Sequence, residues 1–441
     1  MLTVILPSLN VEKYISQCLV SVVNQTYRNL EIICVDAGST DGTLDIIRKF
    51  KEQDSRIKIV NCDKKSYGIQ VNMAMDLAKG KYIAIVDTDD FLELDMYDNL
   101  VNMAENNKLD YIKQNYYEYY IFQNERVYRK KKAIISDDLY NRVINPKEYP
   151  QLQCQYGYLW CGIYNLDFLK KKGIRFNTTP GAAFQDVGFF HQVTYWAQRV
   201  MFIDRYGYNY RLTRKDNSVA SPNGLKYMVQ EYTRLINLKT IPKVEYEQWK
   251  KIYKKMIISF MTECEKKIIY EAFDDETVKP YLKEAKVLIK NCFTKNYLKK
   301  EDFVDCFLLK LDKLLNNNSR FVYEQNQKQK SIFMVIDRCD RHRKKNKESR
   351  IVIYGCGIRG KRLEEILMKK GVYIDGFIDQ DVCKIGITVD DIQVFDLEHE
   401  RKNNSLYIIS VKNHEKEIEK YLISNGIKKE NICILDESFW S

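Results

Sequence analysis

Short apolar runs alternate with amphipathic segments along the chain up to Asp90. Each run is bounded by polar residues and fits a buried strand, whereas the segments between the runs repeat their apolar residues at helical spacing. This alternation is typical of a parallel, doubly wound α/β sheet. We predict strands at 3–6, 30–35, 57–61 and 82–86 and helices at 14–24, 44–53 and 69–78.

Three of the predicted strands end in a polar or turn-forming residue. Pro7 follows the first strand, Asp36 the second and Asp87 the fourth. Because ligands of open α/β sheets bind outside the carboxyl ends of the strands, we expect these three residues to line one binding edge. The loop at 36–43 is polar and contains Gly38, which permits a positive φ or a close approach of the backbone to a ligand.

The strand at 82–86 runs directly into three carboxylates, Asp87, Asp89 and Asp90. Clustered carboxylates repel one another unless a cation or hydrogen-bond donors offset their charge. They form either a divalent metal site at Asp87 and Asp89 or an acidic first turn of a helix. The convergence of strand ends favours the metal. Asp90 is interpreted as the cap of a helix at 92–107.

A second candidate position lies at the start of an apolar helix predicted at 187–197. Asp186 precedes this helix and follows a break in the chain at Pro180 and Gly181. Its carboxylate is either an N-cap or a general base that accepts a proton from a substrate hydroxyl. His191 is interpreted as a packed helical residue.

Beyond residue 224 Gly and Pro become rare, and apolar residues recur at helical spacing. We predict several helices here, which either pack on the first domain or join two copies into a homo-oligomer. These helices either bury one face in a core and expose the other face to solvent, or their tyrosines and lysines face a membrane. The charged stretch at 325–350 is predicted to be a linker.

The C-terminal part returns to strand–helix alternation and is predicted to be a small Rossmann-like α/β domain. The sequence GCGIRG at 355–360 follows a predicted strand at 351–354 and opens a helix. This context fits a helix N-terminus that receives a phosphate, although the domain is long enough for only half of a dinucleotide fold. The predicted domains are 1–224, 225–348 and 349–441.

Composition narrows the classes of protein. Of the 441 residues, 45% are hydrophobic, as in folded proteins. The net charge of +11 fits a solvated surface or a face that attracts anionic groups, and without a binding module it predicts no nucleic-acid partner. Four histidines and twelve cysteines without a CxxC pair disfavour zinc. No apolar run spans a bilayer and the N-terminus lacks a basic leader, so a cytoplasmic protein is expected.

Two segments carry a resemblance to a known family. LPSLNVEKYISQCLVSVVNQTYRNLEIICVDAGSTDGT and GKYIAIVDTDD resemble the family 2 glycosyltransferases, with the nucleotide-binding half of a GT-A fold. The resemblance implies transfer of a sugar from a nucleotide sugar, here a UDP-sugar, with Mn²⁺ or Mg²⁺ as cofactor. It also implies a glycan or lipid-linked acceptor in cell-surface polysaccharide synthesis, and peripheral contact with the inner face of the plasma membrane.

The resemblance also implies roles for single residues. Asp87 and Asp89 bind the metal, and Asp186 is the catalytic base of a single displacement that inverts the anomeric carbon. Near the acceptor, Trp160 is either a stacking platform for a sugar ring or part of the core, and Gln185 lies beside Asp186. The implied nucleotide contacts are Pro7, Leu9, Glu12, Asp36, Gly68, Asn72, Asp87, Thr88, Arg211 and Ser218.

The sequence departs from the family pattern at three positions. Leu9 replaces an aromatic residue, so a contact there would use the backbone, and Ala37 replaces an Asp, which removes a polar contact to the base. Gln185 stands where Glu is common, which leaves Asp186 as the base. The QxxRW motif of processive synthases is absent, which indicates addition of one or a few sugars.

Two rival functions stay open. The chain could bind a nucleotide sugar without transferring it, or act as an NAD-linked sugar-modifying enzyme through its C-terminal domain. That domain resembles the N-terminal part of sugar acyltransferases, and serves either as a nucleotide site or as a structural unit. The second nucleotide site would include Gly355, Gly357, Gly360 and Asp379.

Overall fold

The computed structural model describes residues 1–122, 125–134, 136–155, 157–212, 224–238, 246–271, 275–345 and 349–435. The chain divides into two compact units, which differ from the three predicted domains. The first unit comprises Met1–Glu263 and Lys279–Val304, and the second comprises Cys264–Val278 and Asp305–Ser441. Each unit contains one sheet.

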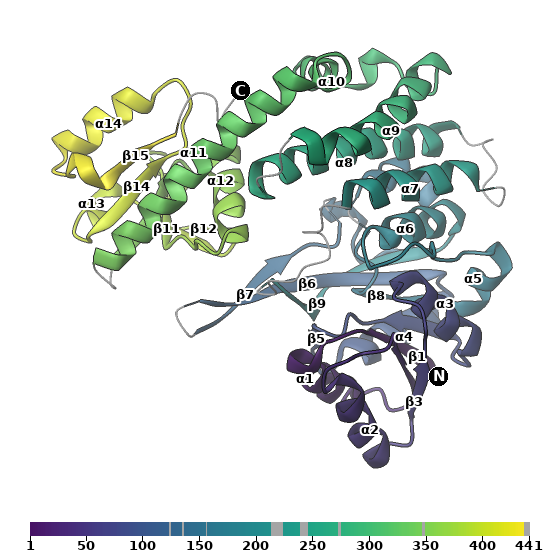
Figure 1. Ribbon diagram of the computed structural model, residues 1–441. Helices are drawn as coiled ribbons and strands as arrows, with labels where there is room; N and C mark the ends of the chain where they lie inside the picture. Colours follow the sequence, from purple (N-terminus) through teal and green to yellow (C-terminus); the bar gives the residue numbers. More distant parts are fainter. Residues whose placement is uncertain are drawn as a thin grey trace. The chain divides into compact units, whose positions relative to one another are not determined.

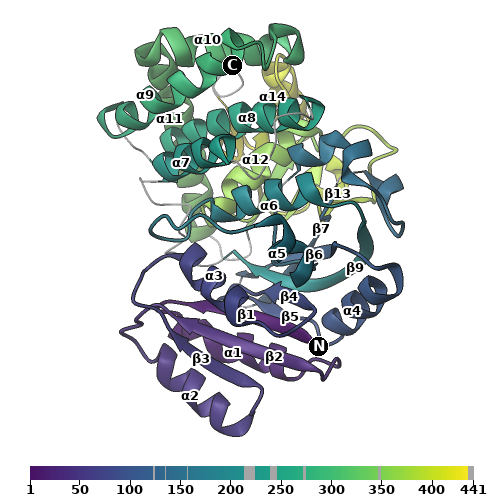
Figure 2. The same cartoon turned by 90° about the vertical axis from the view of Figure 1, so that its right-hand side faces the viewer.

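Four parallel strands form one half of the sheet in the first unit (Figure 1). They are β1 (Leu2–Ser8), β2 (Leu30–Asp36), β3 (Ile57–Asn61) and β4 (Tyr82–Ile85). Their order is β3-β2-β1-β4, and Figure 2 shows them side by side. All residues of β1, β2 and β4 are buried, as expected of parallel strands covered on both faces. The predicted parallel α/β arrangement is confirmed.

The other half of this sheet is mixed. β4 pairs antiparallel with β8 (Gly162–Asn165), which also pairs antiparallel with β6 (Tyr111–Phe122). β6 pairs in parallel with β9 (Val200–Arg211), and β9 pairs antiparallel with β5 (Phe91–Leu92). β7 (Glu125–Lys131) forms a hairpin with β6.

Helices cover this sheet and build one continuous core with it. Ile15, Cys18, Leu19 and Val22 of the first helix lie in that core, as their spacing predicts, and Val23 packs against it partly buried. The helices of the first unit are α1 (Glu12–Val23), α2 (Thr43–Gln53), α3 (Tyr67–Leu77), α4 (Met96–Asn107), α5 (Leu166–Lys172), α6 (Gln185–Trp196) and α7 (Gly224–Asn237), with most of α8 (Tyr246–Glu271) and α9 (Asp275–Thr294).

A buried carboxylate lies where α7 packs against α6. Glu231 is 1% exposed, and its Oε1 atom lies where a side chain at Gly188 of α6 would begin. Asn177 Nδ2 donates a hydrogen bond to Glu231 Oε2 at 2.7 Å, and Arg234 lies 3.6 Å from Oε1. Burial raises the pKa of Glu231 to about 7.

We expect Glu231 to make the first unit less stable as pH rises from about 4.5 to about 7. Its pKa is higher in the folded than in the unfolded chain, so the unfolded chain ionises first, at a cost of up to about 3 kcal/mol. Urea unfolding at several pH values in this interval should show that the free energy of unfolding of the native chain falls as pH rises. In Glu231→Gln this decrease should be absent. Glu247→Gln, at an exposed site of α8, is the control. A loss that persists in Glu231→Gln would contradict the assignment.

The second unit contains α10 (Asp305–Asn316) and α11 (Asn318–Lys345). In place of the linker predicted at 325–350, α11 is one continuous helix. Its residues Ile332, Val335 and Cys339 pack into a core shared with the C-terminal sheet. A long helix that buries few apolar residues has a charged composition similar to that of a linker. For this reason the sequence pattern predicted a linker where the structure has a helix.

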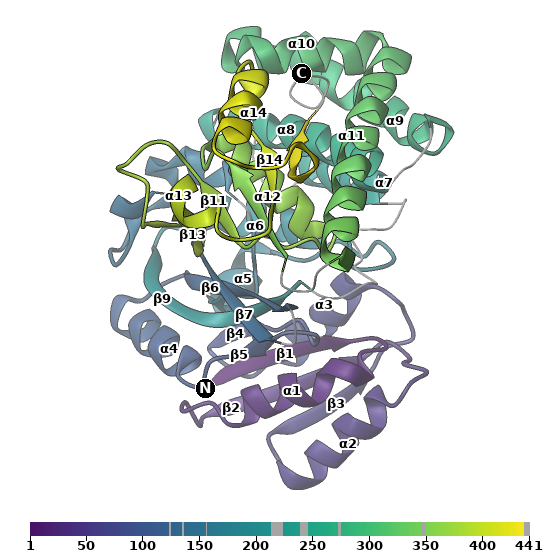
Figure 3. The same cartoon turned by 90° about the vertical axis from the view of Figure 1, so that its left-hand side faces the viewer.

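The sheet of the second unit has the order β12-β13-β11-β10-β14-β15. Figure 3 labels β11, β13 and β14 of this sheet. Its strands are parallel except β12, which pairs antiparallel with β13. Residues of α11 and α12 pack on one face, and residues of α13 and α14 on the other. The five parallel strands, numbered in chain order, are arranged 3-2-1-4-5, as in doubly wound nucleotide-binding sheets. The elements are β10 (Arg350–Tyr354), α12 (Ile358–Lys369), β11 (Gly376–Ile378), β12 (Thr388–Val389), β13 (Ile392–Phe395), α13 (Leu397–Glu400), β14 (Ser405–Ile409), α14 (Glu415–Ser424) and β15 (Ile432–Ile434).

Within the described parts of both units, no helix has the length and apolarity that crossing a membrane would require.

Candidate active site

The predicted strand ends meet at one edge of the first sheet. β1 lies between β2 and β4, and Ser8 at its end pairs in register with Asp36. Thr88 Oγ1 donates a hydrogen bond to the Pro7 carbonyl at 2.9 Å, which ties the end of β1 to the segment after β4. The topology therefore places Pro7, Asp36 and Asp87 along one edge, as predicted from the chain order.

Asp36 shapes the loop that follows β2. Its Oδ2 atom accepts hydrogen bonds from the N–H groups of Gly38 and Ser39, both at 3.0 Å, and Oδ1 accepts one from Ser39 Oγ. Gly38 has φ +78°, a left-handed conformation that favours glycine. Asp36 is buried, and Ala37 donates its N–H to the Ser8 carbonyl. The loop is thus preformed.

Leu9 and Glu12 lie between β1 and the first turn of α1. Leu9 is half-buried and Glu12 is exposed. The Glu12 N–H donates to Asp41 Oδ2 at 3.1 Å, and the Glu12 side chain lies against Gly42 of the loop after β2. Both residues stay at the edge where the nucleotide is predicted.

The three carboxylates after β4 have different surroundings. Asp87 and Asp89 are half-buried, whereas Asp90 is 1% exposed. Asp90 Oδ2 accepts a hydrogen bond from the Tyr208 hydroxyl, and Oδ1 accepts one from the Arg211 N–H, both at 2.8 Å. Burial, followed by the charges of Asp89 and Asp87, raises the pKa of Asp90 well above its usual range.

The prediction that Asp90 caps a helix beginning at residue 92 is wrong. Phe91–Leu92 form β5, and α4 begins at Met96 with Asp95 at its N-cap. Asp90 instead joins the carboxylate loop to β9, which follows it by more than a hundred residues. In a sequence, an acidic residue before an apolar stretch is typical of a helix N-cap. The role of Asp90 depends instead on its hydrogen-bond partners in β9, which the sequence pattern does not identify.

Arg211 and Tyr208 of β9 hold the carboxylate loop. Arg211 Nε donates to the Asp89 carbonyl at 2.7 Å, and NH2 donates to Gln17 Oε1 at 2.7 Å. The Tyr208 hydroxyl accepts the Asp87 N–H at 3.2 Å. Contact of Arg211 with a diphosphate stays a prediction. Ser218, predicted to close over the same group, lies outside the described residues.

Trp160 belongs to the core of the first unit. It is 5% exposed, and its ring stacks on those of Tyr208 at 4.3 Å and Tyr210 at 5.3 Å between centroids. Of the two interpretations of Trp160, the structure supports the core residue. Because Trp160 packs against Tyr208, it supports the carboxylate loop from behind.

Tyr67, at the start of α3, was not predicted. Its hydroxyl donates a hydrogen bond to Asp87 Oδ1 at 2.9 Å. Burial, the charge of Asp87, this hydrogen bond and then the charge of Asp186 raise its pKa well above the usual value. Tyr67 therefore ties the carboxylate loop to the start of α3, where the adjacent Gly68 binds Gln185.

Asp186 is the second residue of α6 and is half-buried. Burial raises its pKa, while the N–H groups of Val187 and Asp186 and the charge of Lys113 act in the opposite direction. Phe184, at the N-cap, has φ +65°, a strained conformation for a bulky residue. Asp186 is therefore a first-turn residue rather than the N-cap, with the raised pKa that suits a general base.

Three other predicted site residues join α3 to the segment before α6. Asn72 donates to and accepts from the backbone of Phe176, at 3.0 and 3.1 Å. Gln185 is 1% exposed, accepts the Gly68 N–H at 3.2 Å and donates to the Thr179 carbonyl at 2.6 Å. These polar groups bind one another or the backbone within the fold, and ligand contacts of Asn72, Gly68 and Gln185 stay predictions.

Gly68→Ala should destabilise the first unit by about 1–3 kcal/mol or more, because an added Cβ atom would lie 1.8 Å from the Asn177 carbonyl oxygen. The strain would also move the segment that leads to Asp186. Urea denaturation of the native chain and the variant measures the loss. A change within about 0.5 kcal/mol would contradict this account of the glycine.

His191 is packed, as predicted. It is 1% exposed, and its Nδ1 atom lies 2.8 Å from Gln153 Oε1. Burial lowers its pKa to about 3, so the ring is neutral.

The predicted metal ligands, Asp87 and Asp89, come from one short loop. Among the described residues there is no group of three or more His, Cys, Asp or Glu side chains arranged for a metal. Two carboxylates fit a Mg²⁺ or Mn²⁺ ion whose other ligands come from a diphosphate and water. The charges of Asp87 and Asp89 on Asp90 show that negative charge is concentrated here.

In the second unit, the glycines at 355–360 make a tight strand–turn–helix junction. Gly355 has φ +99°, and a Cβ atom on Gly360 would lie 1.9 Å from the Gly355 carbonyl oxygen. Asp379, after β11, accepts the Cys356 N–H at 3.2 Å. Gly357 is the N-cap of α12. Packing within the junction explains Gly355 and Gly360, and a second nucleotide site stays a prediction.

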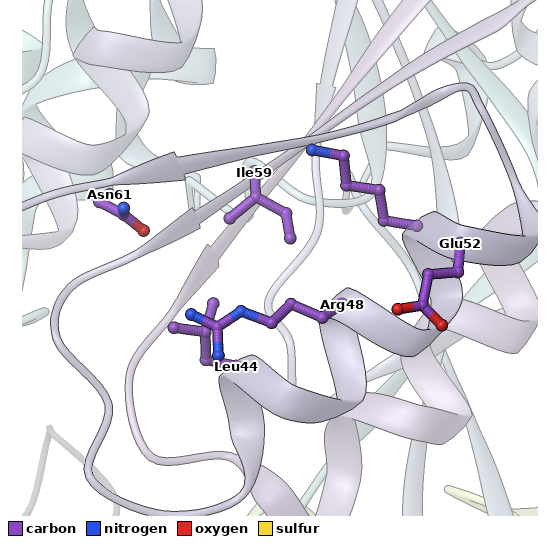
Figure 4. Close-up of a pocket in the computed structure, with 6 residues that line it drawn as sticks. Leu44, Arg48, Glu52, Ile59 and Asn61 are labelled. Carbon is purple, nitrogen blue, oxygen red and sulfur yellow. The ribbon is translucent and has the colours of Figure 1, made fainter.

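The two hollows described next lie on the part of the first unit that the structure describes, and neither includes a predicted site residue. One, of about 500 Å³, lies between α2 and β3 (Figure 4). The other, of about 440 Å³, includes Arg234 of α7. The hollow between α2 and β3 is lined by Leu44, Arg48, Lys51, Glu52, Ile59 and Asn61.

The sequence matches known glycosyltransferases over part of its length. Residues 3–167 match the profile of glycosyl transferase family 2. Glycosyltransferase GlyG of Streptococcus pneumoniae is 38% identical over 120 residues, which are 27% of this chain and 40% of GlyG. The uncharacterized glycosyltransferase EpsJ of Bacillus subtilis is 27% identical over 217 residues, 48% of this chain and 61% of EpsJ. The chain thus spans less than two thirds of these relatives.

The fold is also known. The crystal structure of S. aureus TarS 1–349 in complex with UDP-GlcNAc is similar with a TM-score of 0.54, at 16% identity, over 75% of this chain and 90% of that one. At this identity the likeness concerns the fold. Residues 3–167 of the chain are therefore a family 2 glycosyl transferase domain, in a GT-A-type fold.

Proposed function

We propose that the chain transfers a sugar from a UDP-sugar to a hydroxyl group of a glycan or lipid-linked acceptor. The observation that carries the proposal is the position of Tyr67, which binds Asp87 at the strand edge and lies within the field of Asp186. Gly68, the next residue of α3, binds Gln185, the neighbour of Asp186. This arrangement supports a proposed donor edge and a proposed base that lie close to the start of α3. In a family 2 glycosyl transferase domain, this arrangement favours a transferase over a protein that only binds sugar nucleotides.

The donor site is the edge formed by Pro7, Asp36 and Asp87. The preformed loop after β2 and the ends of β1 and β4 offer backbone and carboxylate groups to a nucleoside. TarS, which shares the fold, is solved in complex with UDP and with UDP-GlcNAc, and this supports UDP as the nucleotide.

Asp87 and Asp89 would hold the divalent metal, Mn²⁺ or Mg²⁺. When bound, such an ion offsets the negative charge of the leaving diphosphate. Arg211 and Tyr208 keep the loop that carries both carboxylates in place. The hydrogen bond from Tyr67 orients Asp87 from the side of α3.

Asp186 serves as the general base. It accepts the proton of the acceptor hydroxyl as that oxygen attacks the anomeric carbon from the side opposite UDP. A single displacement of this kind inverts the configuration. Burial favours the protonated form of Asp186, and this makes the carboxylate more basic than a solvated one. We place the reaction in cell-surface polysaccharide assembly, at the inner face of the plasma membrane.

A screen of UDP-sugars for UDP release tests the function. The full chain is incubated with each donor and a panel of glycan acceptors, with Mn²⁺, with Mg²⁺ or with a chelator. Metal-dependent release with one donor is expected, and NMR of the product should show inversion. Calorimetric binding of UDP without release by any donor would instead support the binding protein, and saturable NAD(H) binding would support the oxidoreductase.

A further inference from the structure

The hairpin of β6 and β7 extends past the proposed donor edge of the first sheet. β6 runs in the same direction as β4, because β8 pairs antiparallel with both, and Ile163 of β8 pairs with Ala84 of β4 and with Ile112 of β6. β4 ends at the residue after Ala84, whereas β6 continues to Phe122, which adds roughly 30 Å of extended chain. Figure 1 shows the hairpin extending away from the rest of this sheet.

One face of the hairpin carries a row of tyrosine rings. Tyr128 of β7 pairs in register with Tyr119 of β6, and its ring centroid lies 5.2 Å from that of Tyr119 and 5.9 Å from that of Tyr117. Tyr206 of β9 adds a fourth ring, 5.1 Å from Tyr117. Tyr128 is 40% exposed, and Tyr117 and Tyr206 are half-buried. Three strands therefore contribute to one row that reaches solvent.

The buried end of the row contacts the carboxylate loop through an arginine. Tyr119 is 4% exposed, and its ring packs against that of Phe91 at 5.0 Å between centroids. The guanidinium group of Arg211 lies 4.9 Å from the centroid of the Tyr119 ring. The same group donates a hydrogen bond to the Asp89 carbonyl. The row of rings thus leads from the proposed metal loop outward along the hairpin.

Two cations flank the exposed ring. Alternate residues of a strand share a face, so Arg126 and Lys130 lie on the face of β7 that carries Tyr128. Both are exposed, and Lys130 Nζ lies 5.4 Å from the centroid of the Tyr206 ring. Arg126 pairs with Ile121 of β6, which is 49% exposed. From 117 to 121 and from 126 to 130, the described residues on this face include no carboxylate.

The chemistry of this face fits a carbohydrate that bears negative charge. Sugar rings present C–H groups that pack on aromatic rings, and their hydroxyl groups form hydrogen bonds with tyrosine hydroxyls. Exposed cations without neighbouring carboxylates attract anionic groups. A bilayer would also attract cations and aromatic rings. Two observations favour a glycan: the rings form a row along the strands, half-buried between neighbours, and the row ends at the carboxylate loop.

We propose that this face docks the acceptor, a glycan chain with anionic groups that lies along the hairpin and directs its reacting end toward the carboxylate loop. The proposal rests on the transferase function proposed above. The docking face consists of Tyr117, Ile121, Arg126, Tyr128, Lys130 and Tyr206. A chain held there would keep its end at the donor edge during transfer, because the hairpin begins at that edge.

Binding of oligosaccharides to the full chain tests the role of the aromatic row. Calorimetry with hyaluronan and heparin oligosaccharides, which are anionic, should show saturable binding of at least one. Tyr128→Ala should weaken it by about 5- to 30-fold, and Tyr128→Phe, which keeps the ring, should bind within about 3-fold of the native chain. Tyr421→Ala, at a tyrosine that is also 40% exposed, is the control. Native affinity in Tyr128→Ala, or no binding of either anionic glycan, would overturn the proposal.

The role of charge is tested with a double variant. Arg126→Gln with Lys130→Gln should weaken binding by about 3- to 10-fold at low salt. Lys49→Gln with Lys51→Gln, at exposed positions of α2, removes the same charge and is the control. A neutral chitin oligosaccharide of the same length should bind more weakly than the anionic probe. Equal affinity for chitin would overturn the anionic character of the acceptor.

Vesicles of phosphatidylcholine and phosphatidylglycerol distinguish a membrane from a glycan. Vesicle binding that requires the docking face, without binding of the oligosaccharides, would overturn the proposal in favour of a membrane surface. The binding measurements do not require turnover. Glycan binding at this face in a chain that releases UDP from no donor would therefore support the docking face and contradict the transferase function alone. UDP release that is unaffected by the hairpin variants would contradict the docking face alone.

Discussion

Replacing Asp186 by Asn is expected to reduce sugar transfer by about 100- to 10,000-fold. The amide has the size of the carboxylate but does not accept the proton of the acceptor hydroxyl. Burial already disfavours the charged form of Asp186, so the neutral side chain should leave the fold intact. Initial rates of UDP release at saturating donor, together with thermal unfolding, measure both effects.

The control for this substitution is Asp167→Asn. Asp167 is also the second residue of a helix, α5, but it is exposed. The two variants change the same charge at the same helical position, so a helix-dipole effect of at most about 1 kcal/mol is common to both. Calorimetry should show UDP binding to Asp186→Asn at the affinity of the native chain. Turnover of Asp186→Asn within a factor of about 3 of the native rate would exclude Asp186 as the base.

The acid side of the pH profile gives an independent check of the same assignment. As pH falls through the pKa of Asp186, the base becomes protonated and kcat should decline. Because burial raises this pKa, the decline should begin above the usual range of an aspartate. The residual activity of Asp186→Asn should lack this limb.

The sequence was sufficient to predict that the ends of β1, β2 and β4 meet at one edge of the sheet. Buried parallel strands read as continuous apolar runs, and chain order alone places the residues after β1, β2 and β4 at neighbouring strand ends. The first inference depends on a local sequence pattern and the second on a topological rule for parallel sheets. Neither requires knowledge of contacts with residues far away in the sequence.

Roles that depend on distant partners could not be predicted. Asp90 looks like a cap until Tyr208 and the Arg211 N–H, on a strand much later in the chain, occupy both of its oxygens. Gln185 resembles a ligand residue until α3 binds its amide. In each case the sequence gives the type of the residue but not its hydrogen-bond partner, because the two residues are far apart in the sequence.

The same limit explains why Tyr67 was missed. A tyrosine before a glycine is typical of a turn. The role of Tyr67 in the fold appears once its hydroxyl group binds Asp87, twenty residues later in the chain. The family resemblance assigned this residue no role.

Asp89→Asn should reduce transfer at least about 100-fold and remove the metal dependence of UDP binding. A carboxylate that shares a divalent ion with a diphosphate contributes charge that an amide lacks. The conformation of the loop should be unchanged, because Arg211 Nε donates to the backbone carbonyl of Asp89 and the Arg211 backbone N–H donates to Asp90. Calorimetric titration of UDP with and without Mn²⁺ separates this effect from a loss of folding.

Asp45→Asn is the matched control, since Asp45 is exposed in the first turn of α2 and pairs with Arg48. The native chain and this control should bind UDP more tightly with Mn²⁺ than in a chelator, whereas Asp89→Asn should bind UDP equally in both. If Asp89→Asn kept the full Mn²⁺ enhancement, the metal would have to be held elsewhere. The charges of Asp89 and Asp87 would then serve the fold, since both raise the pKa of Asp90, which binds Tyr208 of β9.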